Sequence, residues 1–152
     1  MPAGSPPQVI GAVIDLLSMQ EGILMREALG CTDNPITWQG NVLHGGNFHA
    51  LPVALCSDQQ ALGVHQLAFL AERQLALLLD PHHNGGKPPM LTPDPGPASG
   101  LAGVQIAATS FVAKIRQLAY PATLTALPTN LGNQDHVPMA LNGANTVADL
   151  VR

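Results

Sequence analysis

The third apolar segment of the chain constrains its fold most strongly. Apolar residues recur there at alternating intervals of three and four positions: Leu101, Val104, Ala108, Phe111, Ile115 and Leu118. This spacing places one continuous apolar stripe along a helix, and such a stripe needs a second helix to cover it. We therefore expect residues 98–118 to form one helix of an all-α bundle.

Three further segments show helical periodicity, and each is bounded by residues that favour a helix end. The first spans residues 5–30, from a serine followed by two prolines to a glycine. The second spans about residues 49–79, and the last runs from about residue 134 towards residue 152. The sequence therefore predicts a single domain, residues 1–152, with about four long helices in an antiparallel bundle.

The connections between these helices are rich in proline and glycine. Residues 36–43 surround Gln39-Gly40-Asn41 and predict a short hairpin. Residues 81–97 contain six prolines and a Gly-Gly pair, so we expect a rigid loop there. Neither an internal repeat nor a second domain is expected.

The composition favours association between copies of the chain. Charged residues make up 11% of the sequence and apolar residues 46%. Helices with so little charge need another surface to cover them, so we expect a homo-oligomer, either a dimer or a tetramer. A compact monomer with a surface rich in alanine and leucine is the alternative. The six lysines and arginines are scattered, and this argues against a nucleic-acid partner.

Other features point to a cytoplasmic protein without a membrane partner. The longest uninterrupted apolar run extends from Leu75 to Leu79, far short of a membrane span. The first ten residues lack the basic and apolar regions of a signal peptide. Cys31 and Cys56 show no metal-binding spacing, and we interpret them as reduced thiols.

Several polar residues could carry chemistry. Asp58, His65 and Glu72 share one face of the second helix, but neighbours in this row are about 10.5 Å apart along the axis. We interpret the row as a solvated or intersubunit stripe rather than a catalytic site. The adjacent His82 and His83 lack a third ligand, and we expect no metal site.

Histidines also stand beside joints rich in glycine or asparagine, where functional groups are common. His44, His49 and His136 occupy such positions. His49 and His136, with Asp135 and Tyr120, are the candidate acids and bases of the chain. For each histidine, an ordinary helix-end residue is the alternative.

The most distinctive motif is Gly46-Asn47-Phe48-His49-Ala50. It resembles the glycine-asparagine-phenylalanine-histidine segment of histidine and phenylalanine ammonia-lyases. Further matches follow the order of that family along the chain: residues 7–12, 32–35, 71–73, 99–122 and 133–139. Over nearly its whole length, the chain therefore resembles the helical centre of the aromatic amino acid ammonia-lyases and aminomutases.

The resemblance implies substrate-binding roles for four residues. The family's counterpart of Phe48 lines the substrate pocket, and Asn47 precedes it in the same motif. The counterpart of Gln134 is a glutamate in histidine-specific members and a glutamine in members specific for phenylalanine or tyrosine. Asn133 stands beside it. Because a glutamine offers no carboxylate to an N–H group, Gln134 favours a neutral or aromatic ligand.

The departures from the family concern its reactive centre. The family's methylidene-imidazolone electrophile forms from an alanine-serine-glycine that precedes the matched region. Ala98-Ser99-Gly100 has this composition, but it corresponds to a helix start in the family, and we interpret Ser99 as a helix cap. The family's substrate-binding tyrosine and arginine would precede Pro7, and the family continues beyond Arg152. We therefore expect no cofactor and no ammonia-lyase activity from this chain alone.

Three functions remain open. One is a scaffold redeployed as a biosynthetic cyclase or isomerase of specialised metabolism, which would bind a small hydrophobic molecule in a pocket between helices or subunits. The second is one subunit of a split aromatic amino acid lyase or aminomutase, whose partner chain holds the electrophile. The third is a non-catalytic oligomeric binding module.

Overall fold

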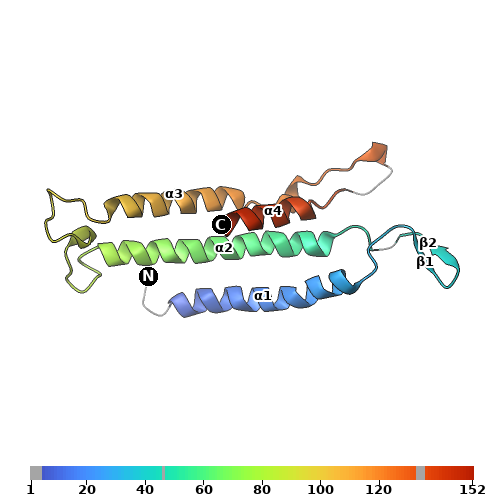
Figure 1. Ribbon diagram of the computed structural model, residues 1–152, viewed down its shortest axis with the longest axis horizontal. Coiled ribbons are helices and arrows are strands. Elements are labelled where there is room, and N and C mark those ends of the chain that lie inside the picture. Colours follow the sequence, from blue (N-terminus) through green and yellow to red (C-terminus); the bar gives the residue numbers. More distant parts are fainter. Residues whose placement is uncertain (1–4, 46, 133–135) are drawn as a thin grey trace.

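The computed structural model describes residues 5–45, 47–132 and 136–152, and helices dominate it (Figure 1). The long helices are α1 (Ser5–Leu29), α2 (Leu51–Leu79), α3 (Ala102–Leu118) and α4 (Ala140–Leu150). The strands β1 (Ile36–Trp38) and β2 (Asn41–Leu43) form the expected antiparallel hairpin. Short 3-10 helices lie in the connections: η1 (Pro89–Leu91), η2 (Ala122–Thr125) and η3 (Asn130–Gly132). The expected all-α fold with four helices is confirmed.

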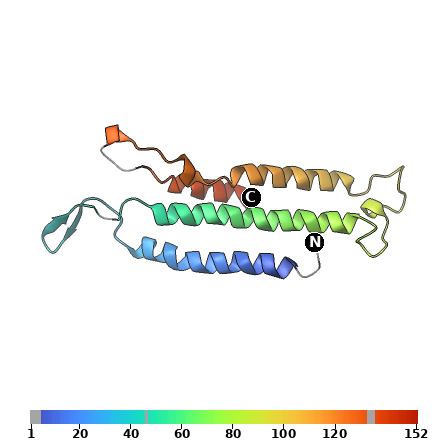
Figure 2. The ribbon, with the colours of Figure 1, turned by 180° about the vertical axis from the view of Figure 1, so that it is seen from behind.

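α2 is the central helix, and the other three pack along it in a flat, layered arrangement. α1 covers one side of α2, while α3 and α4 lie nearly end to end along the other (Figures 1 and 2). α1 and α3 run antiparallel to α2, as expected. α4 differs and runs parallel to α2, because the connection after α3 returns the chain to the start of α2 before α4 begins (Figure 1).

A small cluster of buried apolar residues joins α2, α4 and the end of α3. Its buried centre consists of Ala61 on α2, Ala119 after α3 and Leu150 on α4. Gly143 of α4 lies so close to α2 that an added Cβ would be 3.0 Å from the Ser57 Cβ. Small residues thus let α4 approach α2 closely, and this contact places the segment before α4 beside the start of α2.

The face of α3 that packs on α2 differs from the predicted stripe. Of the six predicted positions, only Ala108 and Ile115 are half-buried, and the other four are exposed. Phe111, the largest of them, is 65% exposed. Val112 and Ala119 are buried instead. The periodicity identified the helix correctly, but the large side chains that define the stripe lie mostly outside its contact with α2.

α2 and α4 each begin later than the sequence predicts, at Leu51 and Ala140. The residue before each helix has a left-handed backbone, with φ of 53° at Ala50 and 61° at Met139. An α-helix cannot pass through this conformation, so both helices start immediately after it. Two non-glycine residues in the left-handed region therefore border the segments that carry the candidate site.

The start of α3 also differs from the prediction, because Ser99 does not cap it. α3 begins at Ala102, and the helix has no side-chain capping bond at its start. The Ala102 amide donates to the Ser99 backbone carbonyl at 3.1 Å, and the Leu101 amide donates to the Met90 carbonyl at 3.0 Å. These backbone hydrogen bonds therefore occupy amides at the start of α3, which is the capping role predicted for the Ser99 hydroxyl.

Much of α1 is open to solvent. Only Val13 and Gln20 are buried along it, while large apolar side chains such as Ile14 and Met19 are exposed. Among the described residues, α1 alone is long and apolar enough to cross a membrane, a criterion that core helices of soluble proteins also meet. The sequence analysis did not identify α1 as long and apolar enough for this, because it considered only uninterrupted apolar runs.

Candidate functional site

A groove lies where the end of α1 meets the segment that leads into α2. We call it the Phe48 groove. It has a volume of about 540 Å³, within the range of small-molecule sites. The lining side chains come from both segments: Leu24, Glu27, Ala28, Thr32, Asn47, Phe48, Ala50 and Val53. Two of the predicted substrate-binding residues, Asn47 and Phe48, therefore line one groove.

Asn47 is held in place by α1. Its Nδ2 donates a hydrogen bond to Glu27 Oε2 at 2.8 Å. Sequence reasoning missed Glu27, although a physical signal for it exists. Glu27 lies in the last turn of α1, where the negative end of the helix dipole disfavours a carboxylate. An acidic residue in that position indicates a specific partner, and here the partner is Asn47.

His49 and His136 meet beside this segment. His49 Nε2 lies 3.0 Å from the His136 carbonyl oxygen, and the two rings form an edge-to-face contact with centroids 4.8 Å apart. A carbonyl oxygen only accepts, so His49 donates from Nε2, and in a neutral ring Nδ1 is then the acceptor. The structure thus brings together two candidate acid–base residues that are 87 positions apart in the sequence.

The remaining candidates do not join this pair within the described residues. Tyr120 is 63% exposed at the end of α3 and precedes η2, which packs on α2 around Asp58. Asp58 lies about two turns into α2, whereas His49 precedes this helix. Asn133, Gln134 and Asp135 lie outside the described residues, so their roles stay predictions.

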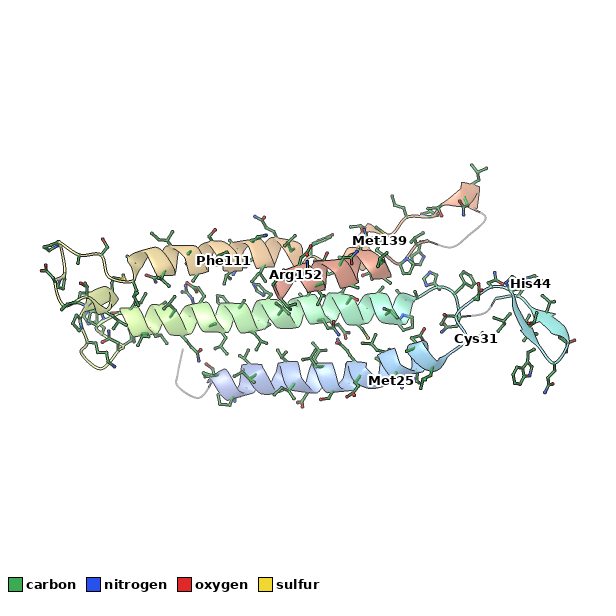
Figure 3. The ribbon with its side chains drawn as sticks, viewed as in Figure 1. Met25, Cys31, His44, Phe111, Met139 and Arg152 are labelled. Atoms are coloured by element: carbon green, nitrogen blue, oxygen red, sulfur yellow. The ribbon has the colours of Figure 1, made fainter. Side chains whose placement is uncertain are left out.

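The joint between α1 and α2 also carries His44 and Cys31 (Figure 3). Both are exposed, and His44 follows β2 rather than lining the Phe48 groove. Cys31 and Cys56 are both free, and burial raises the pKa of the Cys56 thiol. A raised thiol pKa means less thiolate at neutral pH, so Cys56 is not an activated nucleophile.

The row of Asp58, His65 and Glu72 is not a solvated stripe, because both carboxylates are buried. Asp58 is 6% exposed and Glu72 is 5% exposed. Asp58 accepts hydrogen bonds from the Ala122 amide at 2.7 Å, the Thr123 amide at 3.1 Å and the Thr123 hydroxyl at 2.6 Å. The expected solvated or intersubunit role is therefore wrong for Asp58, which holds η2 against α2.

Glu72 performs a similar task between α2 and α3. It accepts hydrogen bonds from the Arg73 guanidinium and from the Thr109 hydroxyl of α3, the latter at 3.2 Å. The Arg73 bond lowers the pKa of Glu72, although burial opposes this shift. The carboxylate stays ionised at neutral pH and stabilises the packing of α3 on α2.

Residues 98–100 do not fit the role of an electrophile for the Phe48 groove. They lie beyond the far end of α2, a helix of 29 residues and therefore about 43 Å long (Figure 1). The Ala98 amide donates to the Asp94 carbonyl at 3.0 Å, and a Cβ added to Gly100 would lie 2.3 Å from the Met90 oxygen. This tripeptide is an ordinary turn that leads into α3.

Among the described residues that line it, the Phe48 groove contains no cation. Of its lining residues, only Glu27 is charged. The neighbouring Arg26 lines a separate groove of about 380 Å³ with Leu51 and Gln59. A carboxylate and an amide suit an ammonium group, whereas a substrate carboxylate would need a cation from elsewhere.

This fold belongs to a known class of protein. Residues 5–152 match the aromatic amino acid lyase family, and the chain belongs to that family. A histidine ammonia-lyase from Bradyrhizobium diazoefficiens is 40% identical over 146 residues, which are 95% of this chain and 28% of that protein.

Solved structures agree with this assignment. A tyrosine aminomutase from Streptomyces globisporus superposes with a TM-score of 0.89 at 39% identity, over 95% of this chain and 28% of that one. A phenylalanine aminomutase from Pantoea agglomerans gives a TM-score of 0.90 at 30% identity, over 95% and 29%. The resemblance seen in the sequence is confirmed, and the chain spans less than a third of the length of these relatives.

Proposed function

We propose that this chain forms one wall of an aromatic amino acid lyase or aminomutase active site, which a further polypeptide segment completes. The observation that supports this is the Phe48 groove in a member of that family. The groove combines an aromatic ring with the bonded pair Glu27 and Asn47, but its lining contains neither a cation nor a group able to serve as the electrophile. Those two functions must come from elsewhere.

Three of the lining residues have a task in this proposal. Phe48 contacts the aromatic ring of the substrate, and Glu27 attracts its ammonium group. Asn47, fixed by Glu27, offers its amide to the same end of the substrate. Asn133 and Gln134 remain predicted contacts of the substrate's aromatic ring, and a glutamine at this position favours a neutral ring.

A second candidate is the redeployed cyclase or isomerase that acts on a small hydrophobic molecule. Two observations favour it: the contact between His49 and His136, and the absence of a cation among the residues that line the groove. An imidazole pair at the edge of a mostly apolar groove can move a proton on a neutral substrate. Asp135 and Tyr120 stay predicted acid–base residues of this alternative.

The exposed apolar residues of α1 and α3 support the proposal of a homo-oligomer, a dimer or a tetramer. They support the non-catalytic oligomeric module equally, and only an activity measurement separates that module from the enzymes. Cytoplasmic localisation is part of the proposal.

The test is complementation in trans. The chain is co-expressed with the parts of the Bradyrhizobium histidine ammonia-lyase that flank the matched region, and the complex is assayed with histidine, phenylalanine and tyrosine. We expect deamination or amino-group migration from the complex and none from either component alone. Phe48→Ala should raise KM for an aromatic substrate at least about tenfold, whereas Phe111→Ala, an exposed phenylalanine on α3, should not.

A complex that forms but acts on none of the three amino acids contradicts the proposal. Turnover of a neutral hydrophobic compound by the chain alone, lost in His49→Ala, would establish the second candidate instead.

A further inference from the structure

A second cavity lies on the opposite side of α2, and the proposed function makes no use of it. It has a volume of about 280 Å³ and lies between α2 and α3. The side chains that matter for its chemistry are Phe69, Glu72, Arg73, Thr109, Val112 and Arg116. We call it the Arg116 cavity.

Two guanidinium groups flank the aromatic ring in this cavity. Arg73 and Arg116 each have their Cζ atom 5.9 Å from the centre of the Phe69 ring. His65 stacks on the same ring, with centroids 6.3 Å apart and an angle of 9° between the planes. Phe69 is therefore in contact with cationic groups, and it also lines the cavity.

The two arginines differ in their partners. Arg73 bonds Glu72, so the charges of that pair cancel. Arg116 donates from Nε to His65 Nε2 at 3.4 Å, and no carboxylate of residues 5–45, 47–132 or 136–152 forms an ion pair with it. The cavity thus has one guanidinium whose charge is not neutralised by the described residues.

The rest of the lining is apolar or already bonded. Val112 is 9% exposed and forms an apolar floor beside Phe69. Thr109 donates to Glu72, so both oxygens of the only carboxylate in the lining already accept hydrogen bonds from neighbouring residues. A single uncompensated guanidinium beside an aromatic and an aliphatic wall matches an anion attached to an apolar body.

We propose that the Arg116 cavity binds a small monocarboxylate with one aromatic ring. The carboxylate pairs with Arg116, and the ring lies against Phe69 and Val112. A cavity of about 280 Å³ is at the small end of ligand sites and suits a single ring. Phe69 lies roughly 27 Å along α2 from its first residue, so this site is separate from the Phe48 groove.

The test uses phenylacetate as the probe and its neutral analogue phenylacetamide as the comparison, titrated into the full chain by calorimetry. We expect saturable phenylacetate binding and at least about tenfold weaker binding of phenylacetamide. Arg116→Gln should weaken phenylacetate binding by a similar factor. Lys114→Gln removes the same charge from an exposed position of α3 and should leave binding unchanged. Phe48→Ala should also leave it unchanged, whatever the fate of the proposed function.

Three results would overturn this inference: no saturable binding, equal affinity for the acid and the amide, or full binding by a folded Arg116→Gln variant. If Arg116→Gln unfolds, the comparison of acid with amide on the unaltered chain still decides. A carboxylate from a second copy of the chain has the same chemistry, so native mass is measured in parallel. Loss of an oligomer in Arg116→Gln, without phenylacetate binding to the unaltered chain, would assign the cavity to that contact and reject the small ligand.

Discussion

The two sides of α2 are built on different principles. On the side of α3 and α4, the buried carboxylates Asp58 and Glu72 make directional hydrogen bonds to elements distant in sequence. On the side of α1, Gln20 Nε2 donates to Gln59 Oε1 at 2.9 Å, and Gln20 Oε1 is buried without a partner among the described residues. The first interface is specified by charge-assisted bonds, and the second depends mainly on shape.

This difference shows which half of the domain is self-sufficient. A buried carboxylate whose two oxygens are both hydrogen-bonded fixes the position of its partner as well as the distance, because moving the partner leaves a charge unpaired. Among the described residues, the buried face of α1 has no such carboxylate, and several of its large apolar residues are exposed. The position of α1 therefore depends more than that of α3 or α4 on what covers it.

The largest expected effect comes from removing the Asp58 anchor. Asp58→Ala deletes three hydrogen bonds and leaves the amides of Ala122 and Thr123 unpaired. We expect the free energy of unfolding in urea to fall by about 3 kcal/mol. Asp15→Ala, on the exposed face of α1, should change it by less than about 0.5 kcal/mol. Equal losses in the two variants would remove the distinction between the two sides.

The second prediction concerns acid. Because the folded pKa of Glu72 is lowered, mainly by Arg73, its ionised form stabilises the fold above the ordinary glutamate pKa. This stabilisation is lost as the pH falls through the lowered pKa. Glu72→Gln should reduce the free energy of unfolding by about 2 kcal/mol at pH 7 and make it depend less on pH in acid. Glu21→Gln, exposed on α1, is the control, and an acid slope unchanged by Glu72→Gln would contradict the assignment.

The third prediction compares Gly143 of α4, which faces α2, with Gly63 of α2, which faces α1. A Cβ at Gly143 would lie 3.0 Å from the Ser57 Cβ, whereas a Cβ at Gly63 would lie 3.4 Å from Val13 Cγ1, the end of a side chain. In either helix, replacing glycine with alanine stabilises the helical backbone by about 1 kcal/mol. With this gain included, we expect Gly143→Ala to lower the free energy of unfolding in urea by about 1 kcal/mol. Gly63→Ala should leave this free energy unchanged or raise it slightly. The reverse order would mean that α1 is the more rigidly packed helix.

The smallest effect on stability should come from the outer face of α1. Ile14 is 55% exposed, so Ile14→Glu should change the free energy of unfolding by less than about 0.5 kcal/mol. It should nevertheless lower the weight-average mass in sedimentation equilibrium, because a charge interrupts the apolar face. Ser18→Glu adds the same charge at an exposed polar position and is the control. Masses that are equal for all three chains would show that this face takes no part in self-association.

The number of helices and the ends of α1, α2 and α3 could be predicted from the sequence, because glycines and prolines limit these ends locally. The starts of α2, α3 and α4 could not, since each helix begins two to six residues later than predicted. The side that α3 presents to α2 could not be predicted, since Val112 and Ala119 pack there while larger apolar residues stay outside. Helical periodicity reports the hydrophobicity of side chains, whereas the close packing of α3 on α2 depends on their size. A stripe of large residues predicts some partner surface, but the partner need not be the nearest helix.

The part of the candidate site that lies within the motif of residues 46–50 could be predicted from the sequence. Asn47 and Phe48 line a groove as the resemblance implied. The partners of these residues were not predictable, because the contact between His49 and His136 spans 87 positions and that between Asn47 and Glu27 spans 20. No local pattern encodes such pairs, and only the packing of whole helices brings them together.

The separate attachment of α1 has a consequence for assembly. Among the helices that the structure describes, α1 packs extensively on α2 alone, and residues 30–50 join the two as a long connection. The α1 helix of one molecule can therefore occupy the same place on another and form the same contacts with α2 there. Dimers made by such domain swapping would be favoured by concentration, and opening the connection would set the rate at which they exchange.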